Sequence, residues 1–225
     1  MLIHFTSDYD KISSILKSQH LLLKYCKETF SNTRGIIASS AAHPMVSFSN
    51  YNEDELINTP ITYGHFGIQF KWEWAKKNNI SPVIYMQNNS PAAEGLEVLL
   101  NERRRNDLLP PKMKLAIMKL KCFTKNAVGN NSKLKDKNFD FTREKEWRFV
   151  PTIKQIDGNR ISENRSTYDR YYNKYNTRIK SYPLGFKITD IDTIYIKREY
   201  LTQFTHDFPQ LIDKVKESNW TSVEN

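Results

Sequence analysis

The stretch Thr142–Pro151, TREKEWRFVP, decides how the rest of this chain is interpreted. Side chains alternate between the two faces of a β-strand, so Glu144, Glu146 and Arg148 are predicted to share one face. Such a face is either an exposed, solvated surface or a functional site, because charged side chains are seldom buried without partners. The remainder of the sequence has to decide between these two interpretations.

Composition indicates a globular protein with a sizeable core. Hydrophobic residues make up 39% of the 225 residues and aromatic residues 12%, which is too apolar for a disordered chain. We expect one α+β domain over residues 1–225. We find no run of about 18 apolar residues, as a membrane span requires, and no amino-terminal signal pattern, so the expected location is cytoplasmic.

Positive charge is concentrated in one part of the chain. The net charge is +9, and residues 101–150 hold 14 Lys/Arg against 6 Asp/Glu, whereas residues 51–100 hold 3 against 6. A basic field of this kind attracts polyanions, so nucleic acid or a phosphate-rich cofactor is an expected partner, although a merely soluble basic surface explains the charge equally well. Lys133, Lys135 and Lys137 are the candidate phosphate contacts within the basic part.

A second candidate nucleic-acid segment lies at 165–175, where tyrosines alternate with arginine and lysine. Aromatic rings and cations in alternation are suited to stacking the bases of single strands, and RNA is preferred to DNA on this ground. Arg170 and Tyr171 are the residues predicted to bind. The alternative is a tyrosine-rich loop that packs on the domain.

Hydrophobic periodicity predicts the following elements. Strands are expected at 2–6, 21–26, 45–50, 64–70 and 83–86, and at the end of 186–196; helices are expected at 8–18, 72–78, 91–106, 111–127 and 199–216. A long loop is expected at 27–44, and a loop or long hairpin at 157–181, where aliphatic residues are nearly absent.

Common catalytic and metal-binding motifs are missing from the sequence. It contains no GxGxxG, P-loop, HExxH or GxSxG pattern, which argues against a Rossmann site, an NTPase, a zincin and a serine hydrolase. Cys26 and Cys122 are far apart, and the histidines show no ligand spacing. We therefore expect two ordinary thiols and no metal.

Three short motifs follow one another in a suggestive order: His4-Phe5-Thr6, Ser47-Phe48-Ser49 and Glu144-Lys145-Glu146. This order resembles that of the ADP-ribosyltransferases, which carry such motifs on an early, a middle and a late strand. The resemblance implies an α+β fold with a split mixed or antiparallel sheet and flanking helices. It also implies NAD as co-substrate.

The same resemblance implies roles for particular residues. Glu146 would stabilise the oxocarbenium-like transition state, and Glu144 would lie nearer the acceptor. The residues expected to hold NAD are His4, Thr6, Ser47, Ser49, Tyr63, Arg34 and Arg148.

A longer pattern resembles the AbiGi family of phage abortive-infection proteins. It consists of HFT, PMVSFSN, YGHFGIQF, PVIYM and EKEWRFVP and covers most of residues 1–151. The family is described as the antitoxin half of a toxin–antitoxin pair. The main hypothesis is an NAD-dependent ADP-ribosyltransferase that modifies nucleic acid and acts as a phage-defence toxin. The alternative is a noncatalytic antitoxin that binds a cognate toxin or nucleic acid and whose cleft is occupied or blocked.

Overall fold

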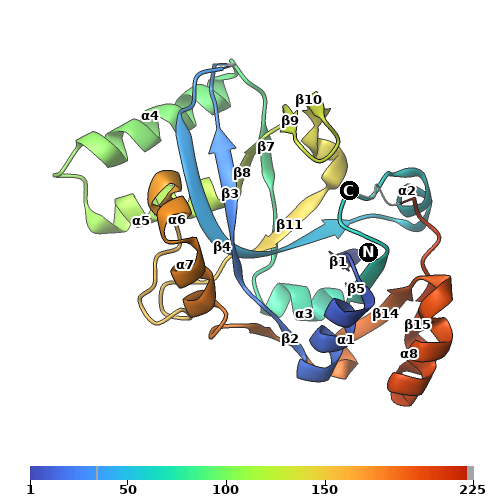
Figure 1. Ribbon diagram of the computed structural model, residues 1–225. Coiled ribbons are helices and arrows are strands. Elements are labelled where there is room, and N and C mark those ends of the chain that lie inside the picture. The colour runs from blue at the N-terminus through green and yellow to red at the C-terminus, as the bar shows by residue number, and fades with distance from the viewer. Residues whose placement is uncertain (34, 222–225) are drawn as a thin grey trace.

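The computed structural model describes residues 1–33 and 35–221, which form a mixed α+β fold around a curled sheet (Figure 1). The strands of this sheet are β1 (Leu2–Thr6), β3 (Lys24–Phe30), β4 (Ser39–Asn50), β5 (Phe66–Phe70), β6 (Ser81–Pro82), β11 (Glu146–Phe149), β12 (Glu163–Asn164), β14 (Ile191–Ile196) and β15 (Val215–Glu217). Their order is β15-β14-β5-β1-β4-β11-β6, and β3 and β12 also pair with β4. The pairings are antiparallel except for β14 with β15. The predicted α+β class is confirmed at this level.

Strand β4 joins two parts of the sheet. At its carboxyl end, Ser49 pairs with Ile3 of β1 on one edge and with Glu146 of β11 on the other. At its amino end, Ala42 pairs with Lys27 of β3 and with Glu163 of β12. Figure 1 shows β4 curving through the middle of the molecule between these two sets of partners.

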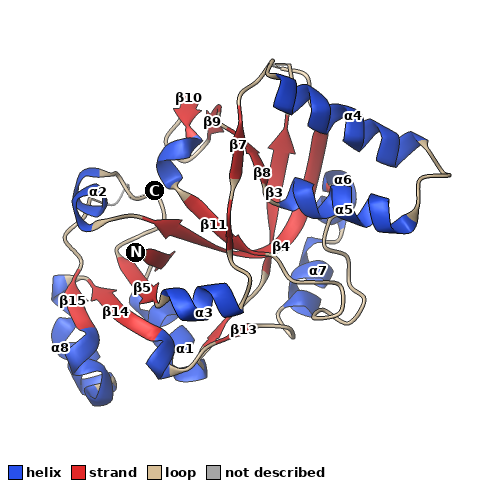
Figure 2. Ribbon diagram, turned by 180° about the vertical axis from the view of Figure 1, so that it is seen from behind, coloured by secondary structure: helices blue, strands red, loops and turns tan. Residues whose placement is uncertain are grey.

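Helices cover both parts of the sheet. Their bounds are α1 (Tyr9–Ser18), α2 (Glu53–Asn58), α3 (Trp72–Lys77), α4 (Pro91–Arg105), α5 (Pro111–Cys122), α6 (Arg165–Arg170), α7 (Tyr172–Ile179) and α8 (Leu201–Asp207). Helices α1, α3 and α8 lie beside the part that holds β5 and β14, whereas α4 to α7 lie beside β3 and the start of β4 (Figure 2). Three short pairs complete the strands: β2 (His20–Leu21) with β13 (Leu184–Gly185), β7 (Ile84–Met86) with β8 (Thr124–Asn126), and β9 (Val128–Asn131) with β10 (Asp136–Asp140).

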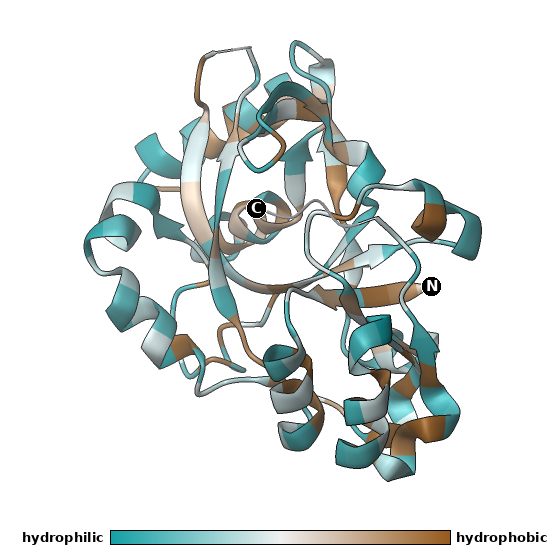
Figure 3. Cartoon of the chain, turned by 45° about the vertical axis from the view of Figure 1, so that its right-hand side comes forward, coloured by the Kyte–Doolittle hydropathy of each residue, from teal (hydrophilic) through white to brown (hydrophobic). Residues whose placement is uncertain are grey.

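The core occupies both faces of the sheet because neighbouring residues of a strand point to opposite faces. Leu2 belongs to the large cluster that contains Phe48 and Phe70, whereas Ile3 belongs to a smaller cluster with Tyr195. In Figure 3 the strand at the amino terminus is brown, and much of the surrounding helix surface is teal. A third cluster lies between the β3–β4 pair and helices α4 and α5; it consists of Phe30, Ala38, Ala93, Leu96, Leu100 and Ile117.

Two helices begin at a side-chain cap. Asp8 caps α1, where its carboxylate accepts the backbone N–H of Lys11 at 2.9 Å, as an N-cap does. Ser90 caps α4 in the same way, ahead of Pro91 at the first helical position.

One turn depends on glycine. Gly64 has a φ of +109°, and a Cβ at this position would lie 2.4 Å from Ser7 Cα and 2.4 Å from the carbonyl oxygen of Thr6. The carbonyl oxygen of Gly64 accepts the indole N–H of Trp220 at 3.0 Å. The turn therefore brings the backbone before β5 directly against the end of β1.

The structure corrects several predicted elements. The segment 27–44 is not one long loop, because β3 extends to Phe30 and β4 begins at Ser39. The segment 157–181 contains α6 and α7, whose buried residues are Tyr168, Asn176 and the single aliphatic residue Ile179. The helix predicted at 111–127 ends at Cys122, since the chain then enters β8.

The helix predicted at 199–216 is also shorter than expected. Only α8 is α-helical there; it is flanked by the 3-10 turns η3 (Arg198–Tyr200) and η4 (Pro209–Lys214), and the chain ends the segment in β15. A further 3-10 turn, η2 (Ile188–Asp190), precedes β14. Pro209 explains the end of α8, because proline cannot continue a helix.

Candidate functional site

The three motif-bearing strands β1, β4 and β11 are neighbours in the sheet. A ring nitrogen of His4, Nδ1, lies 2.9 Å from the carbonyl oxygen of Ser47, and the Ser47 hydroxyl donates to Oε1 of Glu146 at 2.9 Å. The predicted His, Ser and Glu residues therefore form one line of contacts across three strands. Burial lowers the pKa of His4, and its contact with the Ser47 carbonyl only partly offsets this effect.

Glu144 lies close to Glu146, but the backbone between them is not the continuous strand that was predicted. It ends the 3-10 turn η1 (Phe141–Glu144), and β11 begins only at Glu146. Between them Lys145 has a φ of 42°, in the left-handed region, so the chain turns and the two glutamates do not alternate along one strand. Both are nevertheless nearly buried, with 6% and 7% of their surface exposed.

Arg148 binds Glu146 inside the protein. Its Nε donates to Oε1 of Glu146 at 2.8 Å, and its Nη2 donates to Oε2 at 2.9 Å. The same guanidinium donates to the carboxylate of Glu28 at 2.7 Å and to the carbonyl oxygen of Cys122 at 2.9 Å. Arg148 has no exposed surface. This arrangement satisfies a buried guanidinium with two carboxylates and one carbonyl.

Lys125 of β8 links the two predicted catalytic glutamates. Its ammonium lies 2.6 Å from Oε2 of Glu144 and 3.3 Å from Oε2 of Glu146, and it also lies 4.3 Å from the centre of the Phe141 ring. The Tyr63 hydroxyl donates to the other oxygen of Glu144 at 3.1 Å. We call Glu28, Glu144, Glu146, Lys125 and Arg148 the carboxylate cluster.

Electrostatics keep Glu146, Lys125 and Arg148 of this cluster ionised. Burial alone would raise the pKa of Glu146, but the charges of Arg148 and Lys125 outweigh it and lower that pKa to about 2. Burial likewise opposes the charged forms of Lys125 and Arg148, yet the surrounding glutamates raise the pKa of both. Glu28 differs, because burial outweighs Arg148 and raises its pKa. At neutral pH, Glu146 is thus a carboxylate whose charge is already neutralised by its own chain.

Three residues predicted to bind NAD remain to be placed: Ser49, Thr6 and Arg34. Ser49 is buried in β4, and its hydroxyl is paired with that of Tyr51. Thr6 ends β1, where it pairs with Phe66. Arg34 lies outside the described residues. Binding of NAD by these residues stays a prediction.

The residues predicted to bind nucleic acid do not come together. Lys133, Lys135 and Lys137 belong to the β9–β10 hairpin, whereas Arg170 and Tyr171 lie at the junction of α6 and α7, on another side of the molecule in both views (Figures 1 and 2). The ammonium of Lys133 donates to the Thr62 carbonyl at 3.2 Å and lies 5.0 Å from the centre of the Tyr63 ring. Lys133 is thus connected to the cluster through Tyr63.

Part of the tyrosine-rich segment packs on the domain, and it does so as helices α6 and α7 and not as the loop of the alternative interpretation. Tyr168 is 1% exposed, and its hydroxyl donates to the carbonyl oxygen of Tyr25 at 3.2 Å. Tyr175 donates to Glu163 at 2.7 Å. Tyr171 and Tyr172 remain exposed.

Sequence reasoning missed two members of the cluster. Lys125 was part of a predicted helix, and Glu28 was part of a predicted loop. Tyr25, Thr29 and Phe30 in KYCKETF favour a β-strand and were a signal for β3, the strand that carries Glu28. We find no comparable signal for Lys125, which lies on the short parallel pair β7–β8.

In this cluster the two glutamates Glu144 and Glu146 are bound by cations of the same chain. Residues 19–197 match the protein family described as "Putative abortive phage resistance protein AbiGi, antitoxin". The chain therefore belongs to the AbiGi family, as its motif pattern predicted. No curated protein and no solved structure matches the chain.

This family description corrects the main functional hypothesis. The family is named for an antitoxin, so the prediction of an ADP-ribosyltransferase toxin is wrong, and the alternative fits better. Within residues 1–33 and 35–221, no three His, Cys, Asp or Glu side chains are grouped to hold a metal ion. None of the described helices has the length and apolar character to cross a membrane.

Proposed function

We propose that this protein is the noncatalytic antitoxin of an abortive phage resistance system and that it neutralises a cognate toxin by binding it. Membership of the AbiGi family supports the antitoxin role. The observation that carries the noncatalytic part is the pairing of Glu146 with Arg148, Lys125 and Ser47. The alternative hypothesis required an occupied or blocked cleft, and these contacts within the chain support it.

Chemistry supports a structural role for the cluster. A carboxylate stabilises a developing positive charge best when it has no closer cation. Glu146 already has two cations within 3.3 Å. Each oxygen of Glu146 also accepts from the side chain of Arg148, which leaves it poorly placed to anchor a ribose hydroxyl.

Two finer expectations accompany this proposal. The ADP-ribosyltransferase-like arrangement of the sheet stays a prediction. If it holds, the fold is a related one in which Lys125 and Arg148 fill the site. Nucleic-acid binding by Lys135 and Lys137, both exposed on the β9–β10 hairpin, also stays a prediction.

Bacterial growth tests the proposal. The chain is expressed alone, the cognate toxin alone, and the two together. We expect normal growth with the chain alone, arrest with the toxin, and recovery with both, together with a complex of the two purified proteins. Arrest by the chain alone, or recovery without a complex, would contradict binding as the means of neutralisation.

A separate assay addresses catalysis. The purified chain is incubated with labelled NAD and with RNA, DNA and protein. We expect neither release nor transfer of label, with or without the toxin. Transfer that disappears in Glu146→Gln would show that the cluster is catalytic and would refute the noncatalytic part of the proposal.

A further inference from the structure

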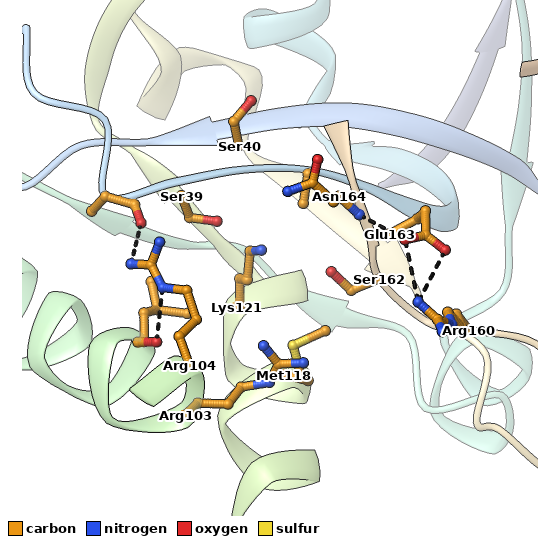
Figure 4. Close-up of a pocket in the computed structure, with 13 residues that line it drawn as sticks. Ser39, Ser40, Arg103, Arg104, Met118, Lys121, Arg160, Ser162, Glu163 and Asn164 are labelled. Atoms are coloured by element: carbon orange, nitrogen blue, oxygen red, sulfur yellow. Dashed lines mark hydrogen bonds and ion pairs between the residues drawn. The ribbon is translucent and has the colours of Figure 1, made fainter. Parts of the chain in front are cut away.

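A cavity of about 370 Å³ lies away from the carboxylate cluster, where α4 and α5 face the start of β4 and residues 160–164 (Figure 4). Four of the described residues that line it are cationic: Arg103, Arg104, Lys121 and Arg160. Glu163 is the one acidic residue among those lining residues. Its carboxylate lies 3.4 Å from Arg160 and also accepts the hydroxyl of Tyr175. The cavity therefore has an excess of positive charge.

Two of the cations lack partners. Among the described residues, Arg103 and Lys121 form no ion pair, and the Nε of Arg103 is buried without an acceptor. A buried donor without a partner costs roughly 1–3 kcal/mol. An anion in the cavity would satisfy this donor.

The cations that line the cavity repel one another. Burial, followed by the charges of Arg103 and Arg104, lowers the pKa of Lys121 to about 8; the neighbouring Cys122 thiol opposes this effect. Arg104 is fixed by hydrogen bonds to the carbonyl oxygens of Ala38 and Leu100. A positively charged side chain is thus held beside two others, and no carboxylate among the described residues forms an ion pair with Lys121.

Neutral donors and an apolar wall complete the cavity. Figure 4 shows Ser39, Lys121 and Ser162 pointing toward a shared space. Leu100 and Met118 line another side. Pockets for small ligands combine a few converging polar groups with apolar walls in volumes of roughly 300–1,000 Å³.

We propose that this cavity binds a phosphate monoester of nucleotide size, with Arg103 and Lys121 contacting the phosphate and Ser39 and Ser162 donating to its oxygens. Guanidinium and ammonium groups are the side chains that bind phosphate most strongly. The apolar side formed by Leu100 and Met118 would contact the base. This site is independent of the proposed antitoxin function.

Titration calorimetry on the full chain tests the proposal with three probes: AMP, inorganic phosphate and adenosine. We expect saturable binding of AMP, weaker binding of phosphate and no binding of adenosine. Arg103→Gln should weaken AMP binding at least tenfold. Arg105→Gln is the matched control, because Arg105 is an exposed residue of the same helix that does not line the cavity.

Folding is checked by thermal unfolding without ligand. Arg103→Gln should leave the midpoint unchanged or slightly higher, since it removes a cation close to Lys121. If that variant fails to fold, Lys121→Gln provides the same test. No saturable binding of AMP or phosphate at millimolar concentration would overturn the proposal. Equal losses of AMP affinity in Arg103→Gln and Arg105→Gln would also overturn the proposal, because they would indicate nonspecific attraction of anions.

Discussion

The guanidinium of Arg148 holds both carboxylate oxygens of Glu146, at 2.8 and 2.9 Å, although the two residues are only two positions apart on one strand. Arg148 is fully buried, so this contact replaces water for both groups. Removing one member of a buried ion pair leaves the other charge without compensation.

Glu146→Gln is therefore expected to destabilise the fold by about 3 kcal/mol, because Arg148 loses one of its two carboxylates while it stays buried. Urea unfolding at pH 7 measures this change. Glu53→Gln is the control, since the Glu53 side chain is 73% exposed, and its effect should stay within about 0.5 kcal/mol. A stable Glu146→Gln would show that the cluster contributes little to folding.

Lys125→Met should destabilise the fold more at pH 7 than at pH 5. Without the ammonium, Glu144 loses its ion pair with Lys125 and Glu146 keeps only Arg148; uptake of a proton by the cluster at lower pH reduces this excess of buried negative charge. Unfolding free energies at the two pH values are compared with those of Lys137→Met, which changes an exposed hairpin residue. A loss that does not depend on pH would point to lost packing on Phe141 instead.

Acid should destabilise the protein through Glu146. Its pKa is about 2 in the folded chain, against an ordinary value of 4.5, so the unfolded chain binds the proton more readily. The stability it contributes is fully present above pH 4.5 and is lost as the pH falls toward 2. Glu28, whose pKa is raised, acts in the opposite direction. As the pH is lowered from 6 to 2.5, the urea concentration at the unfolding midpoint should fall less steeply in Glu146→Gln than in the unchanged chain.

Two glycines form a matched pair for substitution by alanine. Gly64→Ala should cost about 3 kcal/mol, because its Cβ would lie 2.4 Å from backbone atoms of Thr6 and Ser7 and its φ is positive. Gly95 lies inside α4, where an added Cβ would meet open space. Gly95→Ala should therefore raise the free energy of unfolding by about 0.5–1 kcal/mol. Thermal unfolding compares both. Similar midpoints for the two variants would contradict the turn geometry.

Binding of AMP should weaken as the pH rises through 8. The pKa of Lys121 in the free protein is about 8, and only the ammonium form attracts phosphate. The phosphate itself keeps its charge from pH 7.5 to 9, since its second pKa is about 6. The other charged groups that line the cavity are Arg103, Arg104, Arg160 and Glu163, of which Glu163 lies 3.4 Å from Arg160. The Lys121→Gln variant should bind AMP weakly and without this pH dependence. If its AMP affinity depends on pH as in the unchanged chain, Lys121 does not contact the phosphate.

The sequence was most informative where periodicity and motif order agree. The strands that carry His4, Ser47 and Glu146 were predicted individually, and their adjacency matches the motif order that suggested a common site. The position of Glu144 depended on Lys145 adopting a left-handed conformation, which is uncommon for lysine and has no sequence signal here. The cations that fill the site could not be assigned either. Lys125 reaches the glutamates only because β8 pairs with β7, a contact between distant segments.

The shared strand β4 also limits how this molecule can be divided. Both parts of the sheet are completed by the same strand, so neither half has a full set of partners without it. We expect the two parts to lose their amide protection in hydrogen exchange as one unit. In evolution, a recombination point within β4 would separate Ser39 from Ser49 and leave two incomplete halves, so the two parts are expected to be inherited together.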